Sequence, residues 1–340
     1  MISKLCCLLL GLFSFSCLTG ANPLAAPGIT SLTNPKVEFT VSTSGSVQLN
    51  SGENVLVIVN NGAGQTSLTP EHKPGYNGIA YWGHRERKDN LFVPTYAGLN
   101  FEHIHDGTNK ERHVLFEPRH NPMEMRIINE RTVELYQAPT SNWKLESCGR
   151  YELKADGTIE YTFECIPRAN TFSQNYIGLF WASYIHQPEK IGINFWGRES
   201  IEVNSEPEWV HTISPEHGKL STHPPADYAY NIPFDEGFAL TLANHPSGYV
   251  YMAPGYYGVS HDMAFVQLFR QRDQIWFAQS PTGGGDKNPA WDFQWFIPNY
   301  KVDEAYGFVM RAAYFPYTSH QDVLDKAGLL MEELNSDSEE

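Results

Sequence analysis

The sequence predicts an all-β protein, a large antiparallel β-sandwich that ends in a short C-terminal helix. Many short runs of β-branched and aromatic residues are separated by Gly, Pro, Asn and Asp. A strong hairpin signal stands at Asp156-Gly157, and apolar residues recur with a helical period only near the end of the chain. Since sheets without helices bury their apolar faces against other sheets, we predict one sandwich domain over residues 37–335.

The first residues have the pattern of a secretory signal. Lys4 gives the positive region, residues 5–15 the apolar region, and Thr19-Gly20-Ala21 a cleavage site of small residues. We therefore expect residues 1–21 to be removed and the protein to be secreted or periplasmic. A lipid anchor at Cys17 is the alternative, although the residues before it lack the aliphatic side chain that such anchors favour.

Charge and composition exclude some partners. The formal charge of −15 argues against binding to nucleic acid or to anionic lipid, and no later apolar run is long enough for a membrane span. Aromatic residues make up 13% of the chain, with 18 Tyr and 8 Trp. Such residues fill the core of a sandwich and also line carbohydrate grooves, so the count fits both.

The expected elements follow from alternation and turn residues. An extended lead-in over 22–36 precedes the sheets, and long loops are expected over 70–94 and 204–235. A helix is expected from a cap at Ser319 to Leu334, with a disordered tail over 336–340. Strands are expected at 37–41, 46–49, 54–59, 99–105, 113–117, 123–128, 132–136, 143–153, 158–166, 176–185, 191–196, 238–242, 248–252, 264–269, 274–278, 291–297 and 306–314.

The hairpin around Asp156-Gly157 also predicts a disulfide. If these two residues form a type I′ turn, Cys148 faces Cys165 in a non-hydrogen-bonded pair with Cα atoms roughly 4.5 Å apart, which suits a disulfide. One matched pair in an exported chain favours a structural bond in an oxidising compartment. Two free thiols buried in a sheet are the alternative.

The same region resembles a known superfamily. Trp143, the segment Arg150-Tyr151-Glu152-Leu153, the Asp-Gly turn, the segment Thr158–Tyr161 and an aromatic strand around Phe180–Tyr184 are similar to the galactose mutarotase-like β-supersandwich, most specifically over residues 130–196. That superfamily includes aldose epimerases, polysaccharide lyases and glycosidase domains, so the resemblance implies a supersandwich fold and a link to carbohydrate. The strand lacks the His-x-Tyr-Phe pattern of the epimerases and has His186 at its end instead.

Histidines are the main candidates for chemistry. His103 and His105 point to one face of a strand, where they can serve as acid and base, as metal ligands, or as packing residues. His186 follows an aromatic strand and is the third candidate. We expect no cofactor, with a metal at His103 and His105 as the minority alternative. The residues expected to bind substrate are Trp181, Tyr184, Arg198 and Trp291.

The common catalytic motifs are absent: a nucleophile elbow, a phosphate-binding loop, a dinucleotide fingerprint and a zinc-protease helix. We therefore expect a protein that binds or processes carbohydrate as an epimerase, lyase or hydrolase. Its loops 60–110, 197–235 and 282–289 would rim a concave groove. A non-catalytic extracellular binding or structural module is the alternative, and the sequence leaves open whether the protein is an enzyme, which sugar it takes, and its oligomeric state.

Overall fold

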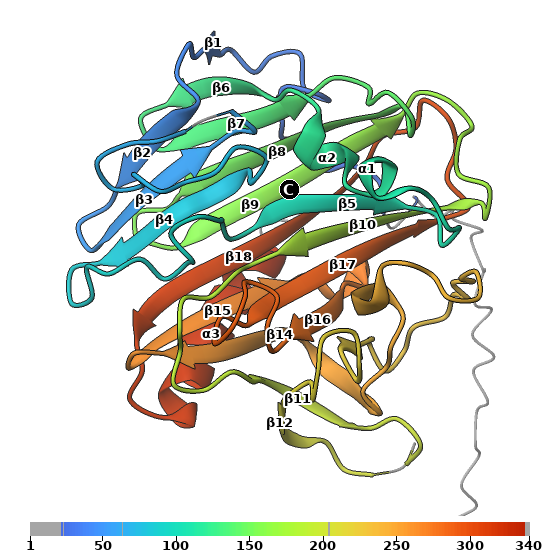
Figure 1. The fold of residues 1–340 in the computed structure, drawn as a ribbon. Helices are drawn as coiled ribbons and strands as arrows, with labels where there is room; N and C mark the ends of the chain where they lie inside the picture. Colours follow the sequence, from blue (N-terminus) through green and yellow to red (C-terminus); the bar gives the residue numbers. More distant parts are fainter. Residues whose placement is uncertain (1–21, 23, 63, 203–204, 337–340) are drawn as a thin grey trace, which may run out of the picture.

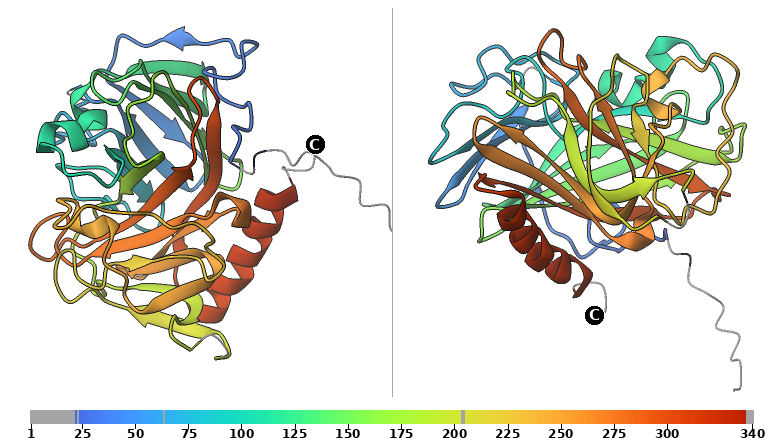
Figure 2. Two further views of the ribbon diagram at one scale, coloured as in Figure 1. Left: turned by 90° about the vertical axis from the view of Figure 1, so that its right-hand side faces the viewer. Right: turned by 90° about the horizontal axis from the view of Figure 1, so that it is seen from below.

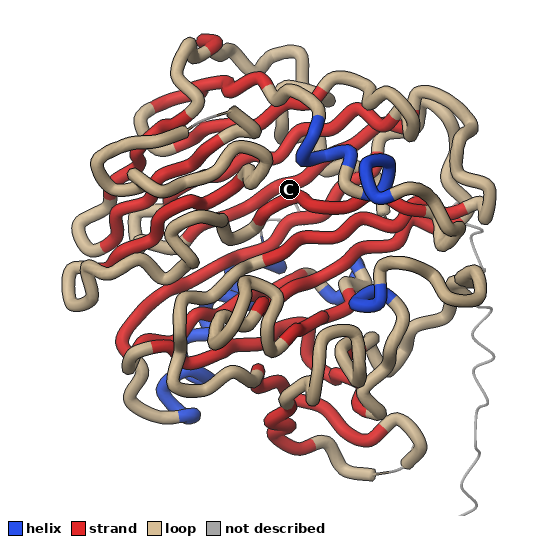
Figure 3. Tube along the Cα trace, in the orientation of Figure 1, coloured by secondary structure: helices blue, strands red, loops and turns tan. Residues whose placement is uncertain are grey.

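The computed structural model describes residues 22, 24–62, 64–202 and 205–336. The predicted signal, including Cys17, and the last four residues of the predicted tail lie outside these residues. Strands joined by turns make up most of the described chain, and helices are few and short (Figure 3). The all-β fold class with a C-terminal helix is confirmed. None of the helices in this part of the chain is long and apolar enough to cross a bilayer.

A ten-stranded antiparallel sheet forms the back layer of the molecule (Figure 1). Its strands, in spatial order, are β1 (Thr40–Val41), β6 (Glu124–Asn129), β7 (Thr132–Gln137), β8 (Leu145–Leu153), β9 (Ile159–Pro167), β18 (Tyr306–Pro316), β15 (Met263–Phe269), β14 (Tyr249–Ser260), β11 (Ile193–Glu199) and β12 (Glu208–Thr212).

Two smaller antiparallel sheets form the front layer (Figure 1). The five-stranded sheet has the order β13 (Thr222–His223), β16 (Trp276–Ser280), β17 (Ala290–Pro298), β10 (Tyr176–Ala182) and β5 (Asn100–His105). The three-stranded sheet has the order β2 (Ser46–Asn50), β3 (Asn54–Val59) and β4 (Gly78–His84).

Aromatic side chains fill the space between the two layers. On β10, Trp181 stacks on Phe293 of β17 with ring centroids 5.2 Å apart, and it meets Phe308 of β18 edge to face at 5.1 Å. On β4, Trp82 lies 5.8 Å from Phe265 of β15. Both front sheets therefore pack on one face of the back sheet, and burial of these large rings is the main stabilising term.

The other face of the back sheet is partly covered by a helix and by the N-terminal segment. Helix α3 (His320–Ser336) lies along it (Figure 2) and buries Val323, Leu330 and Leu334. The predicted cap is confirmed, because the Ser319 hydroxyl accepts a hydrogen bond from the N–H of Asp322 at 3.1 Å. Buried Glu164 accepts backbone N–H bonds from residues 28–30 of the N-terminal segment.

Four sequence-based assignments of secondary structure are wrong. The expected loop over 204–235 contains two strands, β12 and β13. The expected strand over 113–117 is replaced by two helical turns, α1 (Arg112–Leu115) and α2 (Glu117–His120), because Pro118 fits the first turn of a helix and cannot donate to a sheet. The expected strand over 238–242 is a loop that ends in a 3₁₀ turn (Thr241–Ala243). The expected loop over 70–94 contains β4, in which every residue is buried. A second 3₁₀ turn (Gln271–Asp273) precedes β16.

The hairpin is present with a register one residue away from the prediction. The Lys154 N–H donates to the Thr158 carbonyl at 2.8 Å, so the loop has three residues, and Gly157 takes the left-handed conformation with φ 86°. Cys148 therefore pairs with Glu164, and Cys165 pairs with Ser147. Since a shift of one residue reverses the face of a side chain, Cys165 points into the core and Cys148 points to the outer face.

The predicted disulfide is therefore wrong. Cys148 and Cys165 are both buried free thiols, which was the alternative reading of the sequence. The pair gives no support to an oxidising compartment, and the prediction of export now depends on the signal pattern alone.

Candidate active site

The candidate site is a pocket on the outer face of the five-stranded sheet, with a volume of about 200 Å³. Strands β5, β10 and β17 form its floor, and α1, α2 and the chain over 239–243 form its walls. Each of the three segments that the sequence suggested as a rim contributes to it, with Tyr76 and Tyr96 from the first, His217 from the second and Gly283 from the third.

A β-bulge in β5 places two neighbouring titratable residues in this pocket. Phe180 of β10 pairs with His103, but the next residue, Trp181, pairs with Phe101, so Glu102 is the extra residue of β5. Phe101 and Ile104 remain in the core. A bulge turns side chains away from strict alternation, and both Glu102 and His103 therefore face the pocket.

Glu102 is held by two strong hydrogen bonds. Its Oε1 atom accepts from Nη1 of Arg119 at 2.7 Å and from the hydroxyl of Tyr184 at 2.6 Å. The Glu102 side chain is only 6% exposed. Its second oxygen, Oε2, lies 3.7 Å from Nε2 of His103. One oxygen is thus fixed by the protein, while the other has lone pairs left for a ligand.

Arg119 is itself fixed in place. Its Nε donates to the carbonyl of Gly75 at 2.7 Å, and its guanidinium lies 3.7 Å from the centre of the Tyr76 ring. The charge of Glu102 raises the pKa of Arg119 against the opposing effect of burial. Both side chains of the ion pair are therefore held in place by protein contacts before any ligand binds.

Asp292 supplies a second carboxyl group from the central strand β17. Its Oδ1 accepts the backbone N–H of Ser183 at 2.9 Å, while Oδ2 is buried and has no hydrogen-bond partner among the described residues. Burial, reinforced by the charge of Glu102, raises the pKa of Asp292 well above its ordinary value. Asp292 therefore keeps its proton at pH values where an exposed aspartate has lost it.

Two imidazoles complete the polar lining, and both are shifted toward the neutral form. Burial and then the charges of Arg119 and Arg112 lower the pKa of His103 well below its ordinary value. Burial also lowers the pKa of His217, whose Nδ1 lies 2.9 Å from the Ser280 hydroxyl oxygen. A neutral imidazole can accept a proton, so His103 is a second candidate base beside Glu102.

The predicted histidines do not meet in one place. His105 lies on the same sheet face as His103, but it is not part of the pocket lining. It is enclosed by four aromatic rings, those of Tyr176, Phe234, Phe238 and Phe296. Burial lowers the pKa of His105 to about 3. His186 lines a different cavity of about 300 Å³, together with His261 and Tyr314.

Among the residues expected to bind substrate, only Tyr184 reaches the pocket. Trp181 and Trp291 are completely buried in the core, where their indole N–H groups donate to the Tyr161 hydroxyl and the Ile191 carbonyl. Arg198 lies on β11, and its guanidinium donates to the carbonyls of Glu199 and Glu202.

The sequence analysis did not identify Glu102, Arg119 or Asp292 as site residues. For Asp292 a signal was available, because it is an acidic residue between the two core tryptophans of β17.

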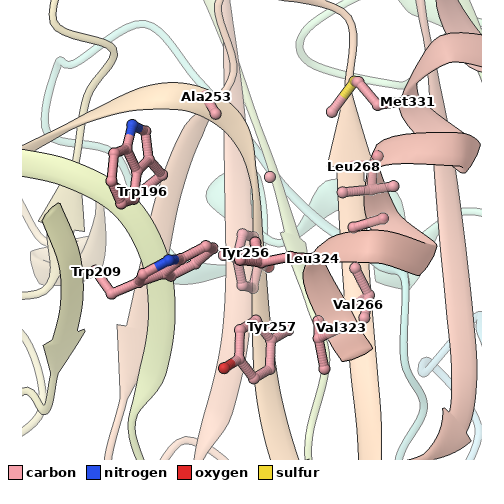
Figure 4. Close-up of a pocket in the computed structure, with 13 residues that line it drawn as sticks. Trp196, Trp209, Ala253, Tyr256, Tyr257, Val266, Leu268, Val323, Leu324 and Met331 are labelled. Atoms are coloured by element: carbon pink, nitrogen blue, oxygen red, sulfur yellow. The ribbon is translucent and has the colours of Figure 1, made fainter. Parts of the chain in front are cut away.

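A larger cavity, of about 390 Å³, lies between α3 and the outer face of the back sheet (Figure 4). Trp196 and Trp209 form one wall and Leu324 and Met331 the other. Among the described residues, no carboxylate, imidazole or amine lines it. No group of three or more His, Cys, Asp or Glu in the described part of the chain is arranged to hold a metal ion.

No family model and no curated protein sequence matches the chain. A putative aldose 1-epimerase from Escherichia coli K12 is similar with a TM-score of 0.43 and 10% identity, and the match covers 82% of this chain and 100% of that one. A galactose 1-epimerase from Lactobacillus acidophilus NCFM has a TM-score of 0.42 and 9% identity, with 83% of this chain and 99% of that one covered. An alpha-N-acetylgalactosaminidase from Bifidobacterium bifidum has a TM-score of 0.45 and 8% identity, with 84% of this chain and 39% of that one covered. Because all these TM-scores are below 0.5, we infer function from the pocket residues.

Proposed function

We propose that the protein is a carbohydrate-processing enzyme that acts on one sugar ring by acid–base proton transfer in this pocket. The observation that carries the proposal is the pairing of two unlike carboxyl groups. Asp292 is kept protonated by burial, and Glu102 is an ion-paired carboxylate. Two titratable groups whose surroundings separate their protonation states are the usual arrangement of an acid and a base.

The pocket suits a sugar ring in size and lining. Its volume of about 200 Å³ is below the roughly 300–1,000 Å³ typical of pockets for drug-sized ligands, which favours one ring over an oligosaccharide. Ring faces of aromatic side chains stack on the C–H faces of sugars. Five such residues form part of the lining: Tyr76, Tyr96, Phe116, Phe180 and Tyr184. Polar groups beside them can bind hydroxyls.

The roles of the two carboxyl groups follow from their protons. Oε2 of Glu102, with its partner oxygen fixed by Arg119 and Tyr184, accepts a proton from a sugar hydroxyl, such as the one at the anomeric carbon. Asp292 donates its proton to the oxygen that leaves that carbon. Neutral His103, 3.7 Å from Glu102, is placed to relay the accepted proton.

Substitutions that change one proton role test this mechanism. We compare Glu102→Gln and Asp292→Asn with His186→Ala, which alters a separate cavity and serves as a matched control. Purified proteins are screened against neutral and acidic sugars and polysaccharides. Anomer exchange is followed by NMR, hydrolysis by new reducing ends, and elimination by the absorbance of unsaturated products.

We expect turnover in the wild type and in His186→Ala, and loss of turnover in the two pocket variants with retained circular dichroism spectra. Loss in His186→Ala together with full activity of Glu102→Gln would refute the assignment. Sugar binding by the wild type without any turnover would support the non-catalytic module instead. Export remains part of the proposal and is tested by N-terminal sequencing of the protein after expression with residues 1–21.

A further inference from the structure

The pocket contains one positive charge that the protein does not neutralise. Arg119 is paired with Glu102, so these two charges cancel. Asp292 is kept protonated by burial, and His103 and His217 are shifted toward the neutral form. The remaining charge is the guanidinium of Arg112, which also lines the pocket.

Arg112 has no ion pair and no side-chain hydrogen bond among the described residues. The neighbouring carboxylate of Glu111 instead lies 3.2 Å from Nδ1 of His113. The guanidinium of Arg112 lies 3.8 Å from the centre of the Phe116 ring, and Phe116 packs edge to face on His103 at 4.0 Å. Phe116 thus positions Arg112 beside the polar lining while leaving its N–H donors open.

We propose that the pocket takes a sugar carrying an anionic group (a carboxylate, sulfate or phosphate), and that Arg112 binds this group. The inference rests on the proposed function, since it names the substrate class of the same pocket. A guanidinium stacked on a ring keeps its planar fork of donors, which matches the oxygens of these anions.

The overall charge of the protein makes a local cation necessary for such a substrate. With a formal charge of −15, the chain repels anions at long range. One unpaired arginine at the pocket offsets this repulsion where the anion binds. The sequence suggested Arg198 for substrate binding, but Arg198 donates to the backbone carbonyls of Glu199 and Glu202, and Arg112 is the arginine in the pocket lining that has no ion pair among the described residues.

Binding of matched sugars tests the inference. Calorimetric titrations compare glucose with glucuronate, glucose 6-sulfate and glucose 6-phosphate, each at low and high salt, so that the source of the anion is also resolved. The proteins are the wild type, Arg112→Ala, Arg112→Lys and the control Arg131→Ala. Arg131 also lacks a side-chain ion pair among the described residues, and it lies in the β6–β7 turn and not in the pocket.

We expect at least one anionic sugar to bind wild type about ten-fold or more tightly than glucose, because charge-assisted hydrogen bonds are among the stronger polar contacts. Arg112→Ala should abolish this preference and leave glucose binding unchanged. Arg112→Lys should keep part of it, because the charge remains without the bidentate fork. Arg131→Ala should behave as wild type.

Two results would overturn the inference: equal binding of neutral and anionic sugars to wild type, or an anionic preference that survives Arg112→Ala. Absence of binding by every sugar would overturn it as well. Turnover of neutral sugars together with equal binding of neutral and anionic sugars would refute the inference while leaving the proposed function intact. Arg112-dependent binding of anionic sugars without turnover would do the reverse.

Discussion

Asp292 makes the clearest link between the site and stability. Below a pH of about 3.9, the ordinary pKa of aspartate, the folded and unfolded proteins both hold its proton. Above that pH the unfolded chain releases the proton, while the folded protein keeps it because burial raises the pKa of Asp292. The folded state therefore loses stability as the pH rises, until the pH passes the raised pKa.

The size of this loss follows from proton linkage. A difference of one bound proton changes the free energy of unfolding by about 1.4 kcal/mol per pH unit. Between pH 5 and pH 7 the ionisation of Asp292 in the unfolded chain therefore costs at most about 2.7 kcal/mol, and this limit is reached when the folded protein keeps the proton throughout. Asp292→Asn removes this cost and keeps the oxygen that accepts the Ser183 N–H at 2.9 Å. We expect the variant to gain stability relative to wild type over this pH range, by at most about 2.7 kcal/mol, while losing activity.

Urea unfolding, followed by tryptophan fluorescence at pH 5 and pH 7, measures this difference. Asp286→Asn is the control, because it makes the same substitution at an exposed position in the 282–289 loop. Equal free-energy differences between Asp292→Asn and wild type at the two pH values would refute the reasoning. That result would mean that Asp292 titrates in the folded protein as it does in the unfolded chain, and it would no longer be available as an acid.

Four further predictions concern the site and the hairpin. Glu102→Gln should lower kcat about 100- to 10,000-fold, the range for lost acid–base catalysis. Glu102→Ala should in addition lower the free energy of unfolding in urea by about 3–5 kcal/mol, because it leaves the charge of Arg119 unpaired. A variant as stable as wild type would contradict this expectation. Gly157→Ala should lower the free energy of unfolding by about 1–2 kcal/mol, because φ is 86° at this residue. An unchanged midpoint of urea unfolding would exclude the three-residue loop. The chain from Asn22 onward, denatured without reductant, should titrate as two free thiols, Cys148 and Cys165; a count of zero would restore the disulfide.

Alternation and turn residues were enough to predict most of the sheets. The strands over 54–59, 132–136, 264–269 and 291–297 lie within one or two residues of β3, β7, β15 and β17, and the C-terminal helix begins at its predicted cap. These elements are set by local chemistry, because inward and outward side chains alternate and Ser319 caps the first turn. Alternation along β17 also explains why Asp292 lies in the pocket while Trp291, Phe293 and Trp295 lie in the core.

The site itself was decided by contacts between distant parts of the chain. One extra residue in β5 turns Glu102 toward the pocket, and its partner Arg119 comes from a helical turn that the sequence analysis did not predict. The hairpin register depends on one more loop residue at Asp156-Gly157, which moves Cys148 away from Cys165. A bulge or a loop residue changes the face of a side chain without changing the composition of a strand. Alternation along the sequence therefore determined the sheets, and only the pairing between strands determined which side chains meet.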